Sequence, residues 1–217
     1  MLAFALPAWS APFAVQLGEA RVVVDAPAGY ADTTFTGSPR LQELAESLTS
    51  ASNRILLFAI SDADLRRFSL GEPLDFRRYM LVATPKTMER GFVSPSAFQE
   101  MEDGALRGLA APPAGTDLAG HLEGQPVGRP STLEALRRDA TAVSLLRGTR
   151  LEPTRIPRMF GHDERQNFAL SSSTLMLVRG KVLNLSVFTL YESPEDAAWI
   201  RALTTAWIEQ LHRLNTR

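Results

Sequence analysis

Few residues of the chain could do covalent chemistry, and its three histidines come first among them. His121 lies in a Gly/Pro-rich segment, His162 in a polar segment and His212 near the C-terminus. No histidine belongs to an H-E-x-x-H pattern, and the chain has no cysteine, which excludes zinc ribbons, iron–sulfur clusters and thiolate nucleophiles. His162, Asp163 and Glu164 offer imidazole and carboxylate ligands, but adjacent residues in a loop more often only solvate it. We therefore predict no bound metal and no cofactor.

Nucleophilic hydrolysis requires a serine beside a base. The sequence contains neither a G-x-S-x-G elbow nor a Ser-x-x-Lys pattern, and its serine run, Ser171 to Ser173, falls in a predicted strand. We predict that the protein is not an enzyme. The alternative that the sequence leaves open is a hydrolase in which His162 acts with Asp163 or with a remote serine.

Arginines gather in the segment "RLEPTRIPRMFGHDERQN". Guanidinium groups bind carboxylates and phosphates through paired hydrogen bonds, so an arginine set of this kind can hold an anionic ligand. The candidate ligand-binding residues are Arg155, Arg158, His162, Asp163 and Arg165. The alternative is a solvated loop between two strands.

Charge and motifs exclude several partners. The chain has 23 basic and 24 acidic residues, so its net charge of −1 gives no global attraction to nucleic acid or to anionic lipid. Neither G-x-G-x-x-G nor the P-loop pattern occurs. No stretch approaches the ~20 apolar residues of a transmembrane helix. We predict no nucleic-acid partner, no membrane span, and an unknown protein or small molecule as the partner.

The first residues, "MLAFALPAWSAPFAV", indicate a compartment. Ala8-Trp9-Ser10 fits the small-x-small rule for signal-peptide cleavage ahead of Ala11, although a positively charged start is missing. We expect residues 1–10 to be a truncated signal peptide and the protein to be periplasmic and bacterial. The alternative is an apolar first strand in a cytoplasmic protein.

Hydrophobic patterns then define the elements that must position any site. Strands are predicted at "FAVQL", "ARVVVD", "RILLFAIS", "RYMLVAT" and "TAVSLLRGTRL", and a long hairpin is predicted around Gly180. Helices are predicted to begin at Ser38-Pro39, Ser94-Pro95 and Ser193-Pro194, because each dipeptide places a hydroxyl cap before a proline at the first helical position.

Two further capping boxes are predicted. Ser61 with Asp64 should begin a short helical turn, and Ser131 with Glu134 should begin a brief helix that runs through Arg138. Between Asp103 and Pro130 the hydrophobic periodicity is lost, which indicates a long Gly/Pro-rich loop.

Together these elements predict a single α+β domain over residues 11–217, with a mainly antiparallel sheet and helices packed on it. We expect the two opening strands and the closing hairpin to share that sheet. A doubly wound parallel sheet is disfavoured because strands and helices alternate irregularly and no Gly-rich turn joins a strand to a helix.

Two segments resemble a known family. "VVVDAPAGY" is similar to the opening strand of the PsbP/Mog1-like superfamily, and "RGKVLNLSVFTLYESPEDAAWIRALTTAWIEQL" is similar to its closing strands and C-terminal helix. The resemblance implies an α/β/α sandwich around an antiparallel sheet, and non-enzymatic accessory or binding roles. The chain also looks like uncharacterised secreted proteins of Gram-negative bacteria.

The sequence thus predicts a non-enzymatic periplasmic accessory or binding protein. Its binding segments are expected at Asp103–Pro130 or Glu152–Asn167, where long irregular polar stretches interrupt a complete folding pattern. Beside the hydrolase, a second alternative is an envelope component that acts by assembling with itself.

Overall fold

The structure, a computed structural model, describes residues 11–216 with the exception of residues 108, 110, 114 and 153–167. Within this part, seven strands form one antiparallel sheet in the order β3-β4-β5-β9-β8-β7-β6. The strands are β3 (Tyr30–Asp32), β4 (Asn53–Ser61), β5 (Arg78–Pro85), β6 (Pro130–Asp139), β7 (Ala142–Arg150), β8 (Phe168–Val178) and β9 (Lys181–Tyr191). The predicted α+β class and antiparallel sheet are confirmed.

The closing hairpin forms the middle of this sheet. Strands β8 and β9 pair without interruption from Phe168 with Tyr191 to Val178 with Lys181. Arg179 and Gly180 turn the chain with φ of 51° and 72°, and a left-handed conformation at both central residues suits a two-residue hairpin turn. The hairpin predicted around Gly180 is confirmed.

Strands β1 (Phe13–Leu17) and β2 (Ala20–Val24) form a separate two-stranded sheet, so the expectation that they join the main sheet is wrong. The free edge of β2 is taken by a side chain: Asn215 accepts from the N–H of Val23 and donates to its C=O, both at 2.8 Å. A helical residue therefore occupies the place where a neighbouring strand would pair.

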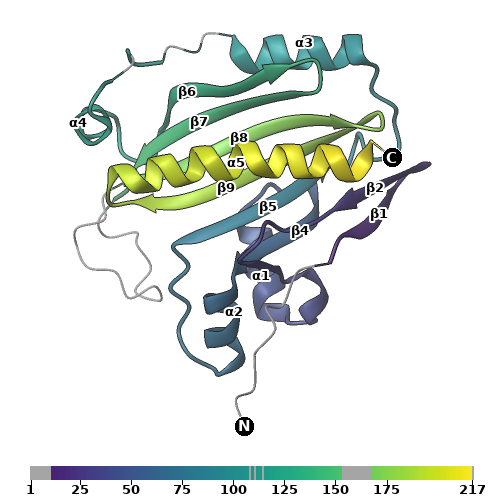
Figure 1. Cartoon of the computed structure of the whole chain (residues 1–217), viewed down its shortest axis with the longest axis horizontal. Helices are drawn as coiled ribbons and strands as arrows, with labels where there is room; N and C mark the ends of the chain where they lie inside the picture. Colours follow the sequence, from purple (N-terminus) through teal and green to yellow (C-terminus); the bar gives the residue numbers. More distant parts are fainter. Residues whose placement is uncertain (1–10, 108, 110, 114, 153–167, 217) are drawn as a thin grey trace.

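Helix α5 (Pro194–Asn215) covers one face of the main sheet (Figure 1). Its apolar stripe is buried, and Trp207 is 1% exposed while its indole N–H donates to the backbone oxygen of Asp25 at 2.8 Å. The small helix α4 (Leu118–Glu123) joins the same core through Leu122. These contacts confirm the predicted packing of the last helix.

The opposite face is covered by three helices. They are α1 (Pro39–Ser47), α2 (Asp62–Ser69) and α3 (Pro95–Leu106). Leu41 of α1 packs on Phe58 and Leu81 of the sheet, and Phe98 of α3 packs on Val182. Helices on both faces make three layers, as the resemblance implied.

Serine caps begin these helices as predicted. Ser38 accepts from the N–H of Leu41, and Ser94 accepts from the N–H of Ala97. At α5, Ser193 forms a capping box with Asp196. Ser61 accepts from Asp64 and begins α2. Each cap satisfies a backbone donor that the first turn of a helix leaves free.

The helix predicted from Ser131 and Glu134 is wrong, because this segment is strand β6. It pairs with β7 from Pro130 with Thr149 to Asp139 with Ala142, with two irregularities in register. A capping box is a local signal, and the backbone hydrogen bonds of a whole strand pair outweigh it.

The Gly/Pro-rich loop predicted over 103–130 is partly helical. Helix α3 continues to Leu106, and Asp117 begins α4 by accepting from the N–H groups of Ala119 and Gly120. Leu122 is fully buried over Gly148, where a Cβ would approach the leucine to 2.5 Å. The small residue on β7 thus makes room for α4.

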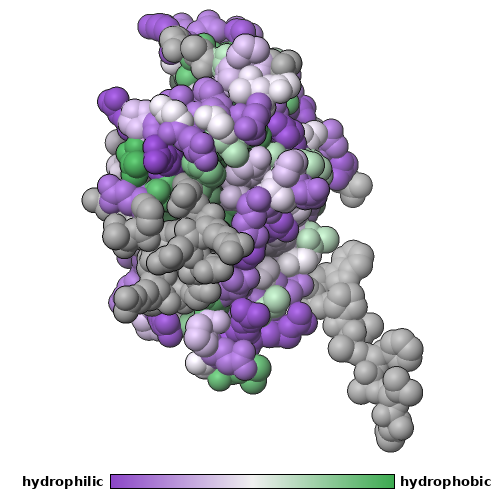
Figure 2. Space-filling view, turned by 90° about the vertical axis from the view of Figure 1, so that its left-hand side faces the viewer, coloured by the Kyte–Doolittle hydropathy of each residue, from purple (hydrophilic) through white to green (hydrophobic). Residues whose placement is uncertain are grey.

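The surface agrees with a closed core. Figure 2 shows one side of the molecule, where hydrophilic residues dominate and apolar residues gather only in small areas. None of the helices in the described part of the chain combines the length and apolar character that a membrane span requires.

The buried hydroxyl pair between α5 and β8 gives a stability test. Thr204 donates to the Oγ of Ser172 at 2.8 Å, and both residues are 2% exposed or less. Thr204→Val keeps the shape and leaves the serine unpaired, so we expect a loss of about 1–3 kcal/mol in the free energy of unfolding, measured by urea denaturation. Thr205→Val, at the exposed neighbour, is the control and should change it by less than about 0.5 kcal/mol. Equal effects of the two substitutions would contradict this role.

Candidate functional site

The candidate ligand-binding residues from the sequence lie outside the described residues. They are Arg155, Arg158, His162, Asp163 and Arg165. The segment 152–167 and the hydrolase alternative built on His162 therefore remain predictions. Among the residues that the structure does describe, no group of three or more His, Asp or Glu side chains is arranged to hold a metal ion.

The other two histidines contact hydroxyl groups. His121 on α4 lies 3.3 Å from Ser131, measured from Nε2 to Oγ. The nearby Asp117 directs its carboxylate to the N–H groups that begin α4 and not to the imidazole. Among the described residues, no carboxylate hydrogen-bonds to His121, so within them the pair lacks the third member of a hydrolytic triad.

His212 is a structural contact between α5 and the β6–β7 turn. Its Nε2 lies 3.0 Å from the Thr141 hydroxyl. Burial and the positive charge of Arg137 lower the pKa of His212, against the opposite effect of Asp139. The imidazole is therefore neutral at pH 7 and links two elements.

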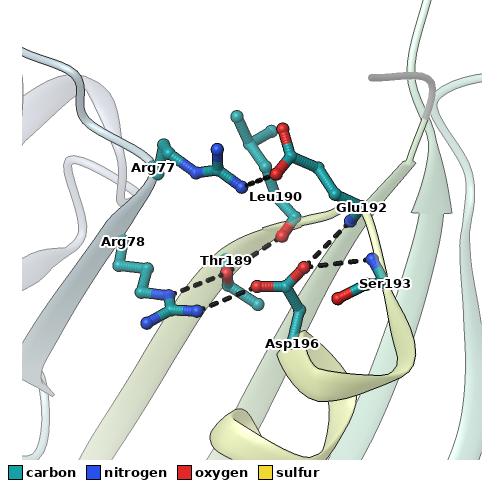
Figure 3. A network of polar contacts seen from close by, with 7 residues as sticks. All are labelled: Arg77, Arg78, Thr189, Leu190, Glu192, Ser193 and Asp196. Atoms are coloured by element: carbon teal, nitrogen blue, oxygen red, sulfur yellow. Dashed lines mark hydrogen bonds and ion pairs between the residues drawn. The ribbon is translucent and has the colours of Figure 1, made fainter. Parts of the chain in front are cut away.

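A network of polar contacts lies at the N-terminal end of α5 (Figure 3). Arg78 on β5 donates to Asp196 at 2.9 Å and reaches Thr189 of β9 at 3.4 Å. Asp196 also accepts from the backbone N–H groups of Glu192 and Ser193. The guanidinium of Arg78 lies 4.1 Å from the ring centroid of Trp199, in cation–π geometry. Beside this cluster, Arg77 pairs with Glu192.

The hydrogen bonds of this cluster hold elements of the fold together. Burial raises the pKa of Asp196, but the hydrogen bonds from Glu192, Arg78 and Ser193 and the charge of Arg78 outweigh it, so the net shift is downward. A lowered carboxyl pKa marks an ion that the fold stabilises, and both carboxylate oxygens are occupied. The cluster joins β5, β9 and α5.

A hollow, which we call the α1 groove, lies between helix α1 and the outer edge of strand β4. It encloses about 620 Å³. The polar side chains of its lining include Thr33, Thr34, Ser38, Gln42, Thr49 and Ser50. Leu41 and Ala45 of α1 and Ile55 and Phe58 of β4 form its apolar floor. A concave, partly apolar hollow with several hydrogen-bonding groups is the usual form of a binding site.

The fold creates this groove by ending β3 early. Strand β3 pairs with β4 only from Tyr30 with Ser61 to Asp32 with Ala59. The chain then leaves the sheet through η1 (Thr34–Thr36), a 3-10 turn, and continues as α1. From Asn53 to Phe58, no described strand pairs with the outer edge of β4.

Asp32 closes the last rung of this edge. Its Oδ1 accepts from the backbone N–H of Phe58 at 3.3 Å and from the N–H and hydroxyl of Thr34. The N–H of Thr33 donates to the C=O of Phe58 at 2.7 Å. Oδ2 of Asp32 is buried and has no hydrogen-bond partner among the described groups. Burial raises the pKa of Asp32, and the hydrogen bonds from Thr34 and Phe58 only partly oppose it.

The charged groups of the groove differ in their partners. Arg54 pairs with Glu89 and donates to the backbone oxygen of Gln16 at 3.3 Å. Lys86 donates to the backbone oxygen of Ala51 at 2.8 Å, and Glu46 accepts from Gln42 at 2.9 Å. The groove therefore offers mainly hydroxyl and amide groups to a ligand.

A second, shallower hollow of about 510 Å³ surrounds the exposed ring of Phe92. Two of its three basic side chains bond to backbone oxygens. Lys181 donates to the backbone oxygens of Glu89 and Gly91, and Arg179 donates to that of Asn215. Arg90 is the third basic residue of the lining.

The α1 groove was not predicted from the sequence. The Ser38 cap and the helix after it were recognised, but the groove depends on where β3 leaves the sheet. A hydroxyl-rich segment, "SLTSASN", borders the groove and is the one local signal that could have indicated it.

The chain was matched against protein families, curated proteins and solved structures. No protein-family model matches the chain, and no curated protein matches its sequence. Among solved structures, the chain is similar to the Ran-binding protein Mog1p of Saccharomyces cerevisiae, with 12% identity and a TM-score of 0.36 over 96% of this chain and 94% of that one.

The cluster at the start of α5 predicts an acid-sensitive stability. Because the pKa of Asp196 lies below its ordinary value of 3.8, its contribution is complete above about pH 4 and is lost as the pH falls through the folded-state pKa. Asp196→Asn should lower the free energy of unfolding by about 1–3 kcal/mol at pH 7, measured by urea denaturation. The difference from the wild-type protein should shrink below pH 3.8.

Glu209→Gln is the control for this measurement. Glu209 and Arg213 form an exposed pair on the same helix at 3.9 Å, so the substitution should change stability by less than about 0.5 kcal/mol. An Asp196→Asn protein whose deficit stays constant from pH 7 to pH 2 would show that the carboxylate charge does not stabilise the fold.

Proposed function

We propose that the protein is a non-enzymatic accessory protein of the bacterial periplasm that binds a partner or a small ligand in the α1 groove. One observation carries the proposal: a hollow of about 620 Å³ between α1 and β4 combines an apolar floor with hydroxyl and amide side chains. Concave, partly apolar hollows with a few polar groups are the usual form of binding sites.

The chemistry of the lining supports binding more than catalysis. Its titratable side chains are Glu46, Arg54 and Lys86, with neither histidine nor cysteine among them. Two of these charged groups hold backbone oxygens, of Gln16 and Ala51, and thereby fix the walls. Hydroxyl and amide groups orient a ligand by hydrogen bonds and do not transfer protons readily at neutral pH.

The segments expected to bind from the sequence stay part of the proposal. Asp103–Pro130 contains α4, where Leu122 is buried and Leu118 and Ala119 pack partly against the core, while the other described residues of the segment are exposed or half-buried. Glu152–Asn167 lies almost wholly outside the described residues. The α1 groove is the site that we propose first because its geometry is described.

A charge-matched pair of variants tests the groove. Glu46 and Glu43 are both exposed residues of α1, and of the two Glu46 lines the groove. Glu46→Arg reverses a charge and adds bulk inside it, so the affinity for a species purified from periplasmic extract should fall at least tenfold by calorimetry. Glu43→Arg should bind within twofold of the wild-type protein. Equal binding by both variants, with unchanged thermal unfolding, would refute the groove as the site.

The compartment has its own test. If the periplasmic proposal holds, N-terminal sequencing of the mature protein from its native host should find a start near Ala11, because signal peptidase cuts after small-x-small residues. A mature protein recovered from the cytosolic fraction with Met1 retained would contradict the periplasmic location and leave the groove proposal untouched.

A further inference from the structure

We propose that the second hollow binds a small organic anion, a carboxylate or phosphate group carried by a flat apolar body. We call this hollow the Phe92 site, because Phe92 lines it together with Arg90, Arg179 and Lys181. The anionic group would lie against the basic side chains, and the apolar body would stack on the ring of Phe92. This inference does not depend on the α1 groove and adds a second site to the proposed function.

Three connections of the chain meet at the Phe92 site. The β1–β2 turn contributes Gly18, and the segment between β5 and α3 contributes Arg90 and Phe92. The β8–β9 hairpin contributes Arg179 and Lys181. Figure 1 shows both hairpin turns at the same end of the molecule, close to the C-terminal end of α5. Residues far apart in the sequence therefore form one site.

Lys181 supplies a buried positive charge. The residue is only 4% exposed, and its Nζ donates to the backbone oxygens of Glu89 at 3.2 Å and Gly91 at 2.5 Å. An ammonium group has three N–H donors, so these two acceptors leave one donor over. Among the described residues, no carboxylate pairs with Lys181. A buried charge without a counter-charge is costly, and a bound anion would offset that cost.

Two arginines extend the positive charge to the surface. Arg90 is exposed and forms no hydrogen bond or ion pair with any residue that the structure describes. Arg179 is held in place, because its guanidinium donates to the backbone oxygens of Asn215 at 3.0 Å and Arg21 at 3.2 Å. Glu19 is the one acidic residue of the lining, so three basic side chains and one acidic side chain give a formal charge of +2. Guanidinium and ammonium groups together suit a carboxylate or a phosphate.

Phe92 gives the site an apolar surface with a fixed position. The residue is 76% exposed, yet one side of its ring lies against Gly180, where a Cβ would approach Cδ2 and Cε2 to 2.3 Å. The N–H of Val93 donates to the C=O of Gly180 at 2.9 Å and holds the backbone beside the ring. A fixed, exposed aromatic ring next to cations can stack on a flat group that carries a negative charge.

Gly18 keeps the site open beside the buried ammonium. A Cβ at this position would approach Nζ of Lys181 to 3.2 Å and Cα of Arg90 to 3.1 Å. The volume of about 510 Å³ lies in the range of small-molecule sites, roughly 300–1,000 Å³. The space therefore suits a ligand with one ring and one anionic group.

Four probes separate the contributions of charge and ring. Phenyl phosphate and benzoate carry both, inorganic phosphate lacks the ring, and phenol lacks the charge. We expect phenyl phosphate and benzoate to bind about tenfold more tightly than inorganic phosphate or phenol, and less tightly as NaCl is added. NMR titration of the full chain measures these affinities. The amide resonances that shift should be those of residues 18–20, 90–92 and 179–181.

Two matched pairs of variants assign these contributions to side chains. Arg90→Gln should weaken the binding of phenyl phosphate about fivefold, whereas Arg40→Gln, at an exposed arginine of α1 outside the lining, should stay within about twofold of the wild-type protein. Phe92→Ala should reduce the affinity for phenyl phosphate to that for inorganic phosphate. Phe35→Ala is its control, because Phe35 is 73% exposed but does not line the site.

Several results would overturn the inference. Phenol that binds as tightly as phenyl phosphate, binding that does not depend on Arg90, or amide shifts confined to other residues would each do so. Vesicles of phosphatidylglycerol test a lipid surface as the other source of an anionic group. If the protein binds these vesicles through Phe92 and none of the soluble probes, a small ligand is the wrong assignment. Glu46→Arg should bind phenyl phosphate as the wild-type protein does, so failure here leaves the α1 groove proposal standing.

Discussion

The attachment of α5 to the main sheet is the constraint on which the rest of the structure depends. The helix is held by apolar burial and by hydrogen bonds that leave few ways to shift it: Trp207 to Asp25, Thr204 to Ser172, and Asn215 to both backbone groups of Val23. A slipped helix would leave these buried polar groups unpaired, at a cost that apolar contacts alone would not impose. The helix thereby fixes both the long hairpin and the separate β1–β2 sheet.

The early end of β3 leaves part of the outer edge of β4 without a paired strand among the described residues. With α5 and the β1–β2 sheet on one face and α1 on the other, the outer edge of β4 lies recessed between two layers. Recession is one way to keep an exposed edge from pairing with other sheets.

The ionic cluster at the start of α5 illustrates why a polar site need not be a working one. Arg78, Asp196 and Trp199 form the kind of charged, partly buried group that often marks function. Here the Asp196 carboxylate accepts from Arg78, Glu192 and Ser193, and the lowered pKa of Asp196 follows from those partners. The α1 groove has the opposite character, because its polar groups line a hollow and the strand edge beside it lacks a described neighbour.

The sequence by itself determined the elements whose signals are local. Hydroxyl caps before proline placed three helices and the turn around Gly180 placed the central hairpin, because each signal depends on residues a few positions apart. Tertiary structure decided what depends on distant neighbours. Pairing with β7 made Ser131–Asp139 a strand despite its capping box. Strand β2 lies in a separate two-stranded sheet, and Asn215 bonds to the backbone of its Val23. The early end of β3 leaves space for the groove beside β4. No pattern within β3 predicts this groove, because it depends on which strands the rest of the chain supplies.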